Sequence, residues 1–238
     1  MKMVLHSKPV LHAVIWILMY LAAVSIGDSL TASTGFAYST GILLFALSIV
    51  LVMYLKNADT VEVFGIRKVT REDARKTLSY VPLLLLACIQ FATGIDRSMS
   101  GMDISVVCLL MTGTGFIEEL LFRGFLFEGI KKKSGTNKAI IISGITFGLG
   151  HIVNLARGYG YAELAGQIIV AVAVGMVLAL LVAVTRNIVP GILFHILFNI
   201  GGSIGNQASG AQAVVLIVIL VVALPYAIYL KKNLGRAG

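Results

Sequence analysis

Charged residues are scarce in this chain, and that scarcity excludes an ordinary soluble domain. Asp, Glu, Lys and Arg make up 13% of the 238 residues, whereas about 25% is typical of soluble proteins. Several apolar runs reach the roughly 20 residues that cross a bilayer as a helix. The sequence therefore predicts an all-α, polytopic integral membrane protein, which would lie in the cell membrane if the host is prokaryotic.

Cysteine is nearly absent as well, and this excludes a disulfide framework or a cysteine metal knuckle. The two cysteines, Cys88 and Cys108, lie inside apolar runs and are interpreted as small buried residues. The chain also lacks internal repeats, low-complexity segments and any mark of a second domain. We therefore predict a single transmembrane domain over residues 1–238.

Eight apolar runs, separated by polar or glycine-rich segments, predict eight transmembrane helices. The first run is long for a signal-peptide core and is followed by further runs, so we interpret it as the first span. The fourth run is unusually long, and we expect a break in it at Gly113 or Gly115. The predicted spans are residues 9–27, 35–55, 78–95, 103–130, 138–156, 162–185, 188–204 and 211–230.

Basic residues fall almost entirely on one side of this arrangement. If the spans alternate in direction, sixteen of the nineteen Lys and Arg residues share the side of both termini, and only Arg97 and Arg157 lie on the other. Because basic loops stay cytoplasmic, both termini are predicted to be cytoplasmic. The formal net charge of +8 then reflects topology and contact with anionic lipid, and no nucleic-acid partner is expected.

Two local signals concern packing rather than chemistry. In the polar loop of residues 56–76, Thr70 is followed three residues later by Asp73, which resembles a capping box and predicts a short interfacial helix before the third span. In the fifth span, Gly144 and Gly148 form a G-x-x-x-G pattern. Small residues at this spacing allow two helix backbones to approach closely in a membrane.

Three spans also carry ionisable or amide side chains at helical spacing. Ionisable groups inside a span are costly, so they usually face the protein interior and mark a functional site. Two residues that are four positions apart share one face of a helix. The groups are Glu118, Glu119 and Arg123 in "EELLFR", Phe147 and His151 in "FGLGH", and His195 and Asn199 in "HILFN".

These groups match one another in depth. Glu118, His151 and Asn199 each lie thirteen residues from a basic residue at the cytoplasmic end of their own span. At 1.5 Å per residue this places all three roughly 20 Å from the cytoplasmic charge layer. Arg123 and His195 fall about one turn nearer to that layer. We therefore expect three helices to bring these groups to one hydrated pocket.

Such a pocket holds a complete set of groups for hydrolysing an amide by direct attack of water. A carboxylate and an imidazole can polarise a water molecule, with the glutamate accepting its proton. Nitrogen donors on His195 and Asn199 can stabilise a developing oxyanion. Glu118 and Glu119 point about 100° apart on a helix, so the two carboxylates cannot have the same role. No Ser or Cys stands beside a His in a way that indicates a covalent route.

Two alternatives remain open from the residues alone. Glu118, His151 and His195 can bind zinc, because one glutamate and two histidines leave an open position for water. The chain has no H-E-x-x-H motif, so this interpretation lacks a local pattern. The polar groups can also form a network that merely holds the helices together, and the pair of Glu119 and Arg123 can be only that.

The remaining polar residues of the spans are expected to be structural. His6 and His12 lie near the N-terminal interface and are expected to be solvated or to face lipid. Glu128 is expected to be a charge at the cytoplasmic end of its span. Interhelical hydrogen bonds are expected for Gln90, Asn154 and Gln167.

With these residues in view, the sequence resembles the CAAX prenyl protease and bacteriocin-processing (CPBP, Abi) family of intramembrane peptidases. The patterns of that family are Glu-Glu-x-x-x-Arg, Phe-x-x-x-His and His-x-x-x-Asn, and the chain meets all three in order between about Gly113 and Gly202. The resemblance implies an eight-helix, CAAX-like intramembrane endopeptidase with its catalytic core at about residues 103–204.

The resemblance also implies a role for each residue. Glu118 would activate water with help from His151. His195 and Asn199 would form the oxyanion site. Supporting roles would fall to Glu119 and Arg123, and Phe147 would shape the substrate pocket. The resemblance points to a metal-free mechanism without a cofactor, and zinc is the alternative.

The expected partners are membrane lipid and a peptide or protein substrate, lipidated or not, that reaches the site from the cytoplasmic leaflet. One rival function is a non-catalytic role in bacteriocin self-immunity or as a membrane scaffold. Another is a proton-coupled transporter that uses Glu118 and Arg123. The absence of repeat symmetry and of paired broken helices counts against a transporter.

Overall fold

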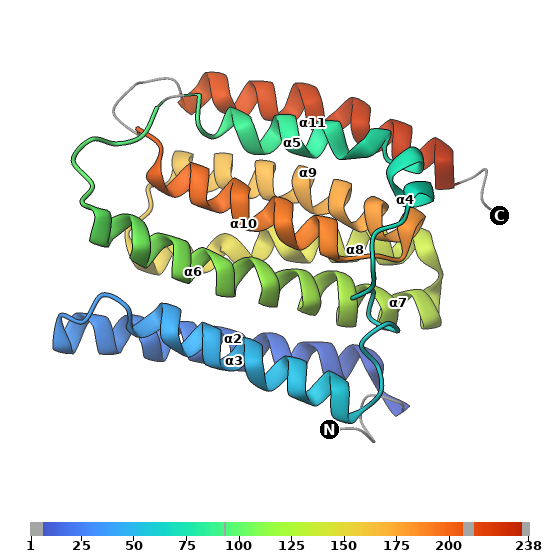
Figure 1. Cartoon of the computed structure of the whole chain (residues 1–238), viewed down its shortest axis with the longest axis horizontal. Helices are drawn as coiled ribbons and strands as arrows, with labels where there is room; N and C mark the ends of the chain where they lie inside the picture. Colours follow the sequence, from blue (N-terminus) through green and yellow to red (C-terminus); the bar gives the residue numbers. More distant parts are fainter. Residues whose placement is uncertain (1–6, 93, 207–211, 235–238) are drawn as a thin grey trace.

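The computed structural model of the chain is a bundle of helices that run along one long axis (Figure 1). It describes residues 7–92, 94–206 and 212–234, so Lys2, His6 and Arg236 lie outside the described residues. The elements are α2 (Pro9–Thr34), α3 (Ser39–Asn57), α4 (Arg71–Lys76), η1 (Leu78–Tyr80), α5 (Val81–Ile89), α6 (Gly101–Glu119), η2 (Leu120–Leu126), α7 (Phe127–Ser134), α8 (Thr136–Gly150), η3 (His151–Arg157), α9 (Tyr161–Thr185), α10 (Val189–Ile204) and α11 (Gln212–Leu234).

Each predicted span contains a helix, but the helices differ in length. Within the described ranges, six helices are long and apolar enough to cross a membrane. The third and seventh predicted spans are shorter apolar helices, Leu78–Ile89 and Val189–Ile204. The predicted all-α class is therefore confirmed, and full-length spans are found for six of the eight predicted segments.

The segment between α3 and α5 explains why the third span is short. The predicted capping box is present, because the Asp73 backbone N–H donates to Thr70 Oγ1 at 3.1 Å and the Thr70 N–H donates to Asp73 Oδ2 at 2.9 Å. Beyond α4, Leu78, Ser79 and Tyr80 have φ values of +52°, +50° and +60°. A right-handed helix cannot pass through such residues, so α5 begins only at Val81.

The two ends of the bundle differ in charge. Figure 1 places the start of α2 at the end of the bundle where α3, α7, α9 and α11 finish. Hydrogen bonds join the loops there, from Ile188 N to Gly65 O at 2.8 Å and from Asn233 Nδ2 to Lys76 O at 3.0 Å. We call this the basic end, which comprises residues 7–9, 56–76, 127–138, 185–189 and 231–234. The opposite end, called the far end, comprises residues 28–38, 90–92, 94–100, 151–163 and 202–206, and its basic residues are Arg97 and Arg157.

The closest helix contact in the bundle core joins α8 to α9 and uses the predicted glycine pair. A Cβ added at Gly144 would lie 2.7 Å from Met176 Cγ, and one added at Gly148 would lie 2.3 Å from Val172 Cγ2. No side chain fits at such distances, so the G-x-x-x-G pattern does mark a close packing surface. This contact fixes the position along the bundle of Phe147, which lies between the two glycines, and of His151, which follows at the start of η3.

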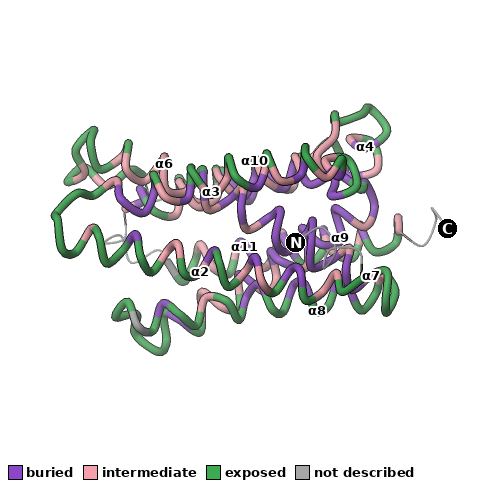
Figure 2. The backbone as a smooth tube through the Cα atoms, turned by 90° about the horizontal axis from the view of Figure 1, so that it is seen from below, coloured by how far each residue is buried: buried purple, intermediate pink, exposed green. Residues whose placement is uncertain are grey.

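Burial is concentrated toward the basic end. In α9, Leu164 and eleven residues between Ala171 and Thr185 are buried, so the half of this helix nearer the far end is mostly accessible. Figure 2 shows the same gradient, with buried stretches gathered near α7 and α9 and exposed stretches at the opposite end. The bundle is therefore tightly packed in one half and open in the other.

Candidate active site

A fully buried ion pair stands near the centre of the bundle. Arg123 Nη1 lies 2.9 Å from Glu119 Oε1, and both side chains are 0% exposed. Arg123 Nη2 also donates to the Gly175 carbonyl of α9 at 3.2 Å, and the guanidinium lies 4.2 Å from the ring centroid of Phe147. Leaving either charge buried without its partner would cost several kcal/mol. The pair therefore fixes the junction of α6, α8 and α9.

The Arg123 side chain is carried by a π-helix that the sequence did not reveal. In η2 the backbone hydrogen bonds join residues that are five positions apart instead of four. All seven residues of η2 are buried. The break expected at Gly113 or Gly115 is wrong, because α6 runs unbroken through both. Instead, Leu44 packs closely against Gly113, and Ile196 packs closely against Gly115. Both residues belong to neighbouring helices. Wide turns of this kind often occur at functional sites.

His195 of α10 lies between the two glutamates. Its Nδ1 is 3.0 Å from Glu119 Oε1, and its Nε2 is 3.4 Å from Glu118 Oε2. An ionised Glu119 can only accept hydrogen bonds, so the Nδ1 atom carries a proton and donates it. The Nε2 atom then points toward Glu118. One imidazole thus connects the two carboxylates that the sequence placed side by side.

The two carboxylates occupy different surroundings, as the helix geometry predicted. Glu119 is fully buried. Within the described part of the chain its Oε2 has no hydrogen-bond partner, and it lies beside Gly191, where an added Cβ would be 3.1 Å away. The Glu118 side chain is 14% exposed and lines a cavity. Only Glu118 can therefore meet a molecule that enters from outside.

Glu118 has a further partner that sequence reasoning missed. The hydroxyl of Tyr20 in α2 donates a hydrogen bond to Glu118 Oε1 at 2.7 Å. The distance is typical of a charge-assisted bond between a hydroxyl and a carboxylate. Tyrosine is common in apolar spans, and nothing in the run around Tyr20 points to Glu118, which lies 98 residues further along the chain.

Phe147 and His151 lie where α8 gives way to η3. Their rings are in edge contact with centroids 5.4 Å apart, and Phe147 makes a similar contact with His195 at 5.4 Å. His151 Nδ1 is also 3.2 Å from the Phe147 carbonyl oxygen. Among the described residues, no hydrogen bond or ion pair joins His151 to Glu118. The phenyl ring of Phe147 therefore holds the two histidines apart while keeping both near the cavity.

The cavity has a volume of about 1130 Å³, and most of the predicted site residues line its wall. Asn199 lines it one helical turn beyond His195, which matches the predicted shared face of α10. Glu119 and Arg123 lie behind this wall. Of the site residues described above, those that line the cavity are Tyr20, Glu118, Phe147, His151, His195 and Asn199.

The zinc alternative needs Glu118, His151 and His195 to converge on one point. Within the ranges that the structure describes, no group of three or more His, Cys, Asp and Glu residues is arranged to hold a metal ion. His151 contacts the ring and carbonyl of Phe147 instead. The donor set therefore does not fit a three-ligand zinc site in this arrangement.

The predictions for the isolated polar residues of the spans are confirmed in part. The expectation for His12 is wrong, because this residue is 0% exposed and hydrogen-bonds the Tyr54 hydroxyl at 2.9 Å. Tertiary packing of α2 against α3 and η2 buries it. The interhelical bond expected of Asn154 is confirmed by its contact with Gln167 at 2.9 Å. Glu128 pairs with a lysine three residues later, as expected of a residue at the end of a span.

Comparison with known proteins agrees with the predicted resemblance. Residues 100–201 match the family model described as type II CAAX prenyl endopeptidase Rce1-like. This segment contains all three patterns and excludes α2, α3, α5 and α11. No curated protein and no solved structure matches the chain. The match and the six apolar helices together support an integral, multi-pass membrane protein whose residues 100–201 are similar to a CAAX prenyl endopeptidase domain.

Proposed function

From the match of residues 100–201 to the Rce1-like type II CAAX prenyl endopeptidases, we propose that this chain is an intramembrane endopeptidase that uses Glu118 to activate water. The observation that carries the proposal is the contrast between its two carboxylates. Glu119 is buried and held by Arg123 and His195, whereas Glu118 lines a large cavity. A structural network alone does not require the second carboxylate to face open space.

In the proposed reaction, water attacks the carbonyl carbon of a peptide bond while Glu118 accepts a proton from that water. The negative charge that develops on the carbonyl oxygen is stabilised by N–H donors of Asn199 and His195, which lie one turn apart on α10. Because His195 Nδ1 already donates to Glu119, its Nε2 must also carry a proton to donate to the oxyanion. Glu118 then returns its proton to the leaving amine as the carbon–nitrogen bond breaks. His151, which lines the same cavity, assists Glu118.

The buried residues have positioning roles in this proposal. Glu119 fixes the orientation of the His195 ring through Nδ1, and Arg123 holds Glu119. Phe147 separates His151 from His195 and shapes the pocket. The groups of this chain are sufficient for the reaction, so the proposed mechanism is metal-free and needs no cofactor.

The proposed topology places the basic end in the cytoplasm, with both termini on that side. All described loop residues with a basic side chain lie at this end except Arg97 and Arg157, and basic loops are retained in the cytoplasm. The substrate is a peptide or protein segment. A non-catalytic role in immunity or as a scaffold is the rival that the following experiment separates.

The test is cleavage by the purified full-length protein in detergent, with a library of membrane-tethered peptides as substrate. We expect specific products, detected by mass spectrometry, with rates unchanged by a zinc chelator. A mock purification from cells that lack the protein controls for contaminating proteases. Loss of activity on chelation, restored by added zinc, would support the zinc alternative. Absence of any product would favour the scaffold.

Replacing Tyr20 by Phe is expected to lower kcat about tenfold and to leave KM unchanged. A hydrogen bond to a charged group contributes about 1.5–3 kcal/mol, and the lost hydroxyl orients Glu118 without touching the substrate. The matched control is Tyr54→Phe, which removes a comparable hydrogen bond, to His12, away from the cavity. Equal kcat values for the two variants would show that Tyr20 has no positioning role.

A further inference from the structure

A buried asparagine holds the start of α10, the helix that carries His195. Asn187 is 0% exposed, and its Oδ1 accepts a hydrogen bond from the backbone N–H of Val189, the first residue of the helix, at 3.0 Å. Its Nδ2 donates in the other direction, to the Arg67 carbonyl at 3.2 Å. A buried carboxamide costs free energy when a donor or acceptor is left unmet, and here both ends are used. Asn187 therefore ties the first turn of α10 to residues 65–73, which we call the strap.

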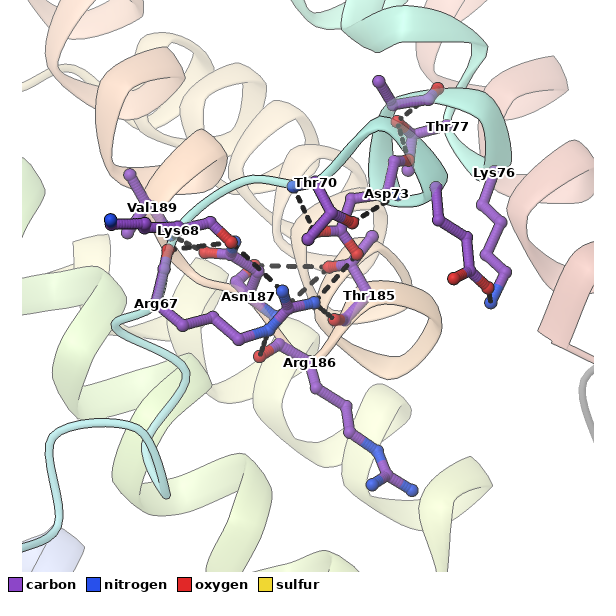
Figure 3. Close-up of polar contacts among 12 residues, drawn as sticks. Arg67, Lys68, Thr70, Asp73, Lys76, Thr77, Thr185, Arg186, Asn187 and Val189 are labelled. Carbon is purple, nitrogen blue, oxygen red and sulfur yellow. Dashed lines mark hydrogen bonds and ion pairs between the residues drawn. The ribbon is translucent and has the colours of Figure 1, made fainter.

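The strap also holds the turn between α9 and α10 through one arginine, as Figure 3 shows. Arg67 Nε donates to the Arg186 carbonyl at 3.2 Å, and Arg67 Nη2 donates to the Thr185 carbonyl. The same Nη2 pairs with Asp73 Oδ1 at 2.8 Å. Because a guanidinium is planar and rigid, these bonds together fix the turn in one orientation.

Asp73 keeps its charge within the strap. Burial acts to raise the pKa of this carboxyl, but hydrogen bonds from Arg67 and Thr70 outweigh burial and hold the pKa below its ordinary value. The carboxylate is therefore ionised at neutral pH. The strap thus depends on a charged pair, and that pair stays intact near neutral pH.

The start of α10 decides where two contacts of the candidate active site fall. Gly191 lies in the first turn of α10, and a Cβ added there would be 3.1 Å from Glu119 Oε2. His195 follows four residues later on the same face, with its Nδ1 3.0 Å from Glu119 Oε1. Glu119 is itself held by Arg123 and cannot follow a displaced helix. A change in the rotation or axial position of α10 therefore breaks the contact between His195 and Glu119.

Apolar packing alone does not set this position of α10. Ile196 packs on Gly115 of α6, but apolar attraction is non-directional. Directional bonds at the start of α10 come from Asn187 and from Ile188, whose N–H donates to the Gly65 carbonyl at 2.8 Å. Both residues are bonded to the strap, so the strap supplies the directional constraint on the helix.

We propose that Asn187 and Arg67 are positioning residues of the candidate active site: by fixing the start of α10, the strap keeps the His195 imidazole bonded to Glu119. The strap lies outside residues 100–201, the segment that matches the family model. The site therefore depends on a part of the chain that this match does not include. For its effect on cleavage the inference rests on the proposed function, whereas for the position of the imidazole it does not.

The position of the imidazole can be measured without substrate, by NMR of the full-length protein in detergent with isotope-labelled histidine. The readout is the rate at which the Nδ1 proton of His195 exchanges with water, and its signal is assigned by its absence in His195→Gln. The variant is Asn187→Ala. Its matched control is Asn233→Ala, because Asn233 of α11 also donates its Nδ2 to a loop carbonyl, that of Lys76, at 3.0 Å.

We expect the Nδ1 proton to exchange at least about tenfold faster in Asn187→Ala than in the wild type, as loss of a hydrogen bond to a charged group implies. The rate should be unchanged in Asn233→Ala. The kcat for cleavage should fall about tenfold in Asn187→Ala at an unchanged KM, because His195 serves the oxyanion rather than substrate binding. Arg67→Lys should act in the same direction, since lysine keeps a charge for Asp73 but lacks the planar fork. This second variant decides the question if Asn187→Ala does not fold.

Exchange as slow as in the wild type, in Arg67→Lys and in folded Asn187→Ala, would overturn the proposal. So would equally faster exchange in Asn187→Ala and Asn233→Ala, which would indicate a general loosening of the bundle. Faster exchange with an unchanged kcat would likewise exclude a positioning role in the reaction. If the wild type cleaves no peptide, the proposed function fails, and the exchange rates still decide whether the strap positions His195.

Discussion

Glu118→Gln is expected to lower kcat for peptide cleavage by about 10²- to 10⁴-fold, the range that a positioned general base supplies. The carboxamide keeps the shape of the side chain and can still accept the Tyr20 hydrogen bond. It cannot take a proton from water. The measurement is single-turnover cleavage of a tethered peptide, with the thermal unfolding midpoint in detergent recorded for the same preparations.

The matched control for this variant is Glu128→Gln. Glu128 lies further along the same continuous helix but pairs with Lys131 at the basic end, 2.9 Å away. It should leave the cleavage rate unchanged. If Glu118→Gln and Glu128→Gln were equally active, Glu118 would not be the base, and the proposed mechanism would be wrong even if the chain were a peptidase.

Arg123→Met is expected to destabilise the fold by about 3–5 kcal/mol, because it leaves the Glu119 carboxylate buried without its cation. Methionine approximates the length of the aliphatic part of arginine, so most of the effect comes from the lost charge and hydrogen bonds. The substitution also removes the hydrogen bond from the guanidinium to the Gly175 carbonyl. The measurement is equilibrium unfolding in mixed detergent micelles, followed by helical circular dichroism.

Two further variants make this second result interpretable. The double variant Arg123→Met with Glu119→Gln should recover much of the lost stability, because no charge is then left unpaired, and the cycle isolates the coupling. Arg157→Met breaks the half-exposed pair with Asp28 and should cost no more than about 1 kcal/mol. A similar cost for Arg123→Met and Arg157→Met would mean that the buried pair is not what holds α6, α8 and α9 together.

Features that depend on residues only a few positions apart could be predicted from the sequence. The apolar runs gave the positions of the spans, the Thr70 and Asp73 pair gave the cap of α4, and Gly144 with Gly148 gave the surface that meets α9. Each depends on residues a few positions apart, whose relative placement is set by helix geometry alone. The prediction that the three patterns meet at one site came from the equal number of residues between each pattern and the basic residue at the end of its span. Contact between Glu118 and His195 at 3.4 Å agrees with that reasoning.

Features that depend on distant parts of the chain were not predictable. The bond between Tyr20 and Glu118, and the burial of His12, exist because α2 packs on η2. No residue near either position encodes that contact. The placement of His151 behind the Phe147 ring depends on where α8 ends, and element boundaries are the least reliable part of a sequence-based prediction.

The π-helix η2 makes this part of the chain intolerant of a change in length. Relative to a regular α-helix, its wide turn behaves as an inserted residue, and removal of one residue would restore the ordinary helical register. The wide turn absorbs the extra residue, so the helix beyond it would keep its orientation, but residues within the turn would shift around the axis by about 100°. Arg123 lies within the turn, and its guanidinium would then leave Glu119. The irregular turn cannot be removed without misplacing this buried charge, so the chain must keep it.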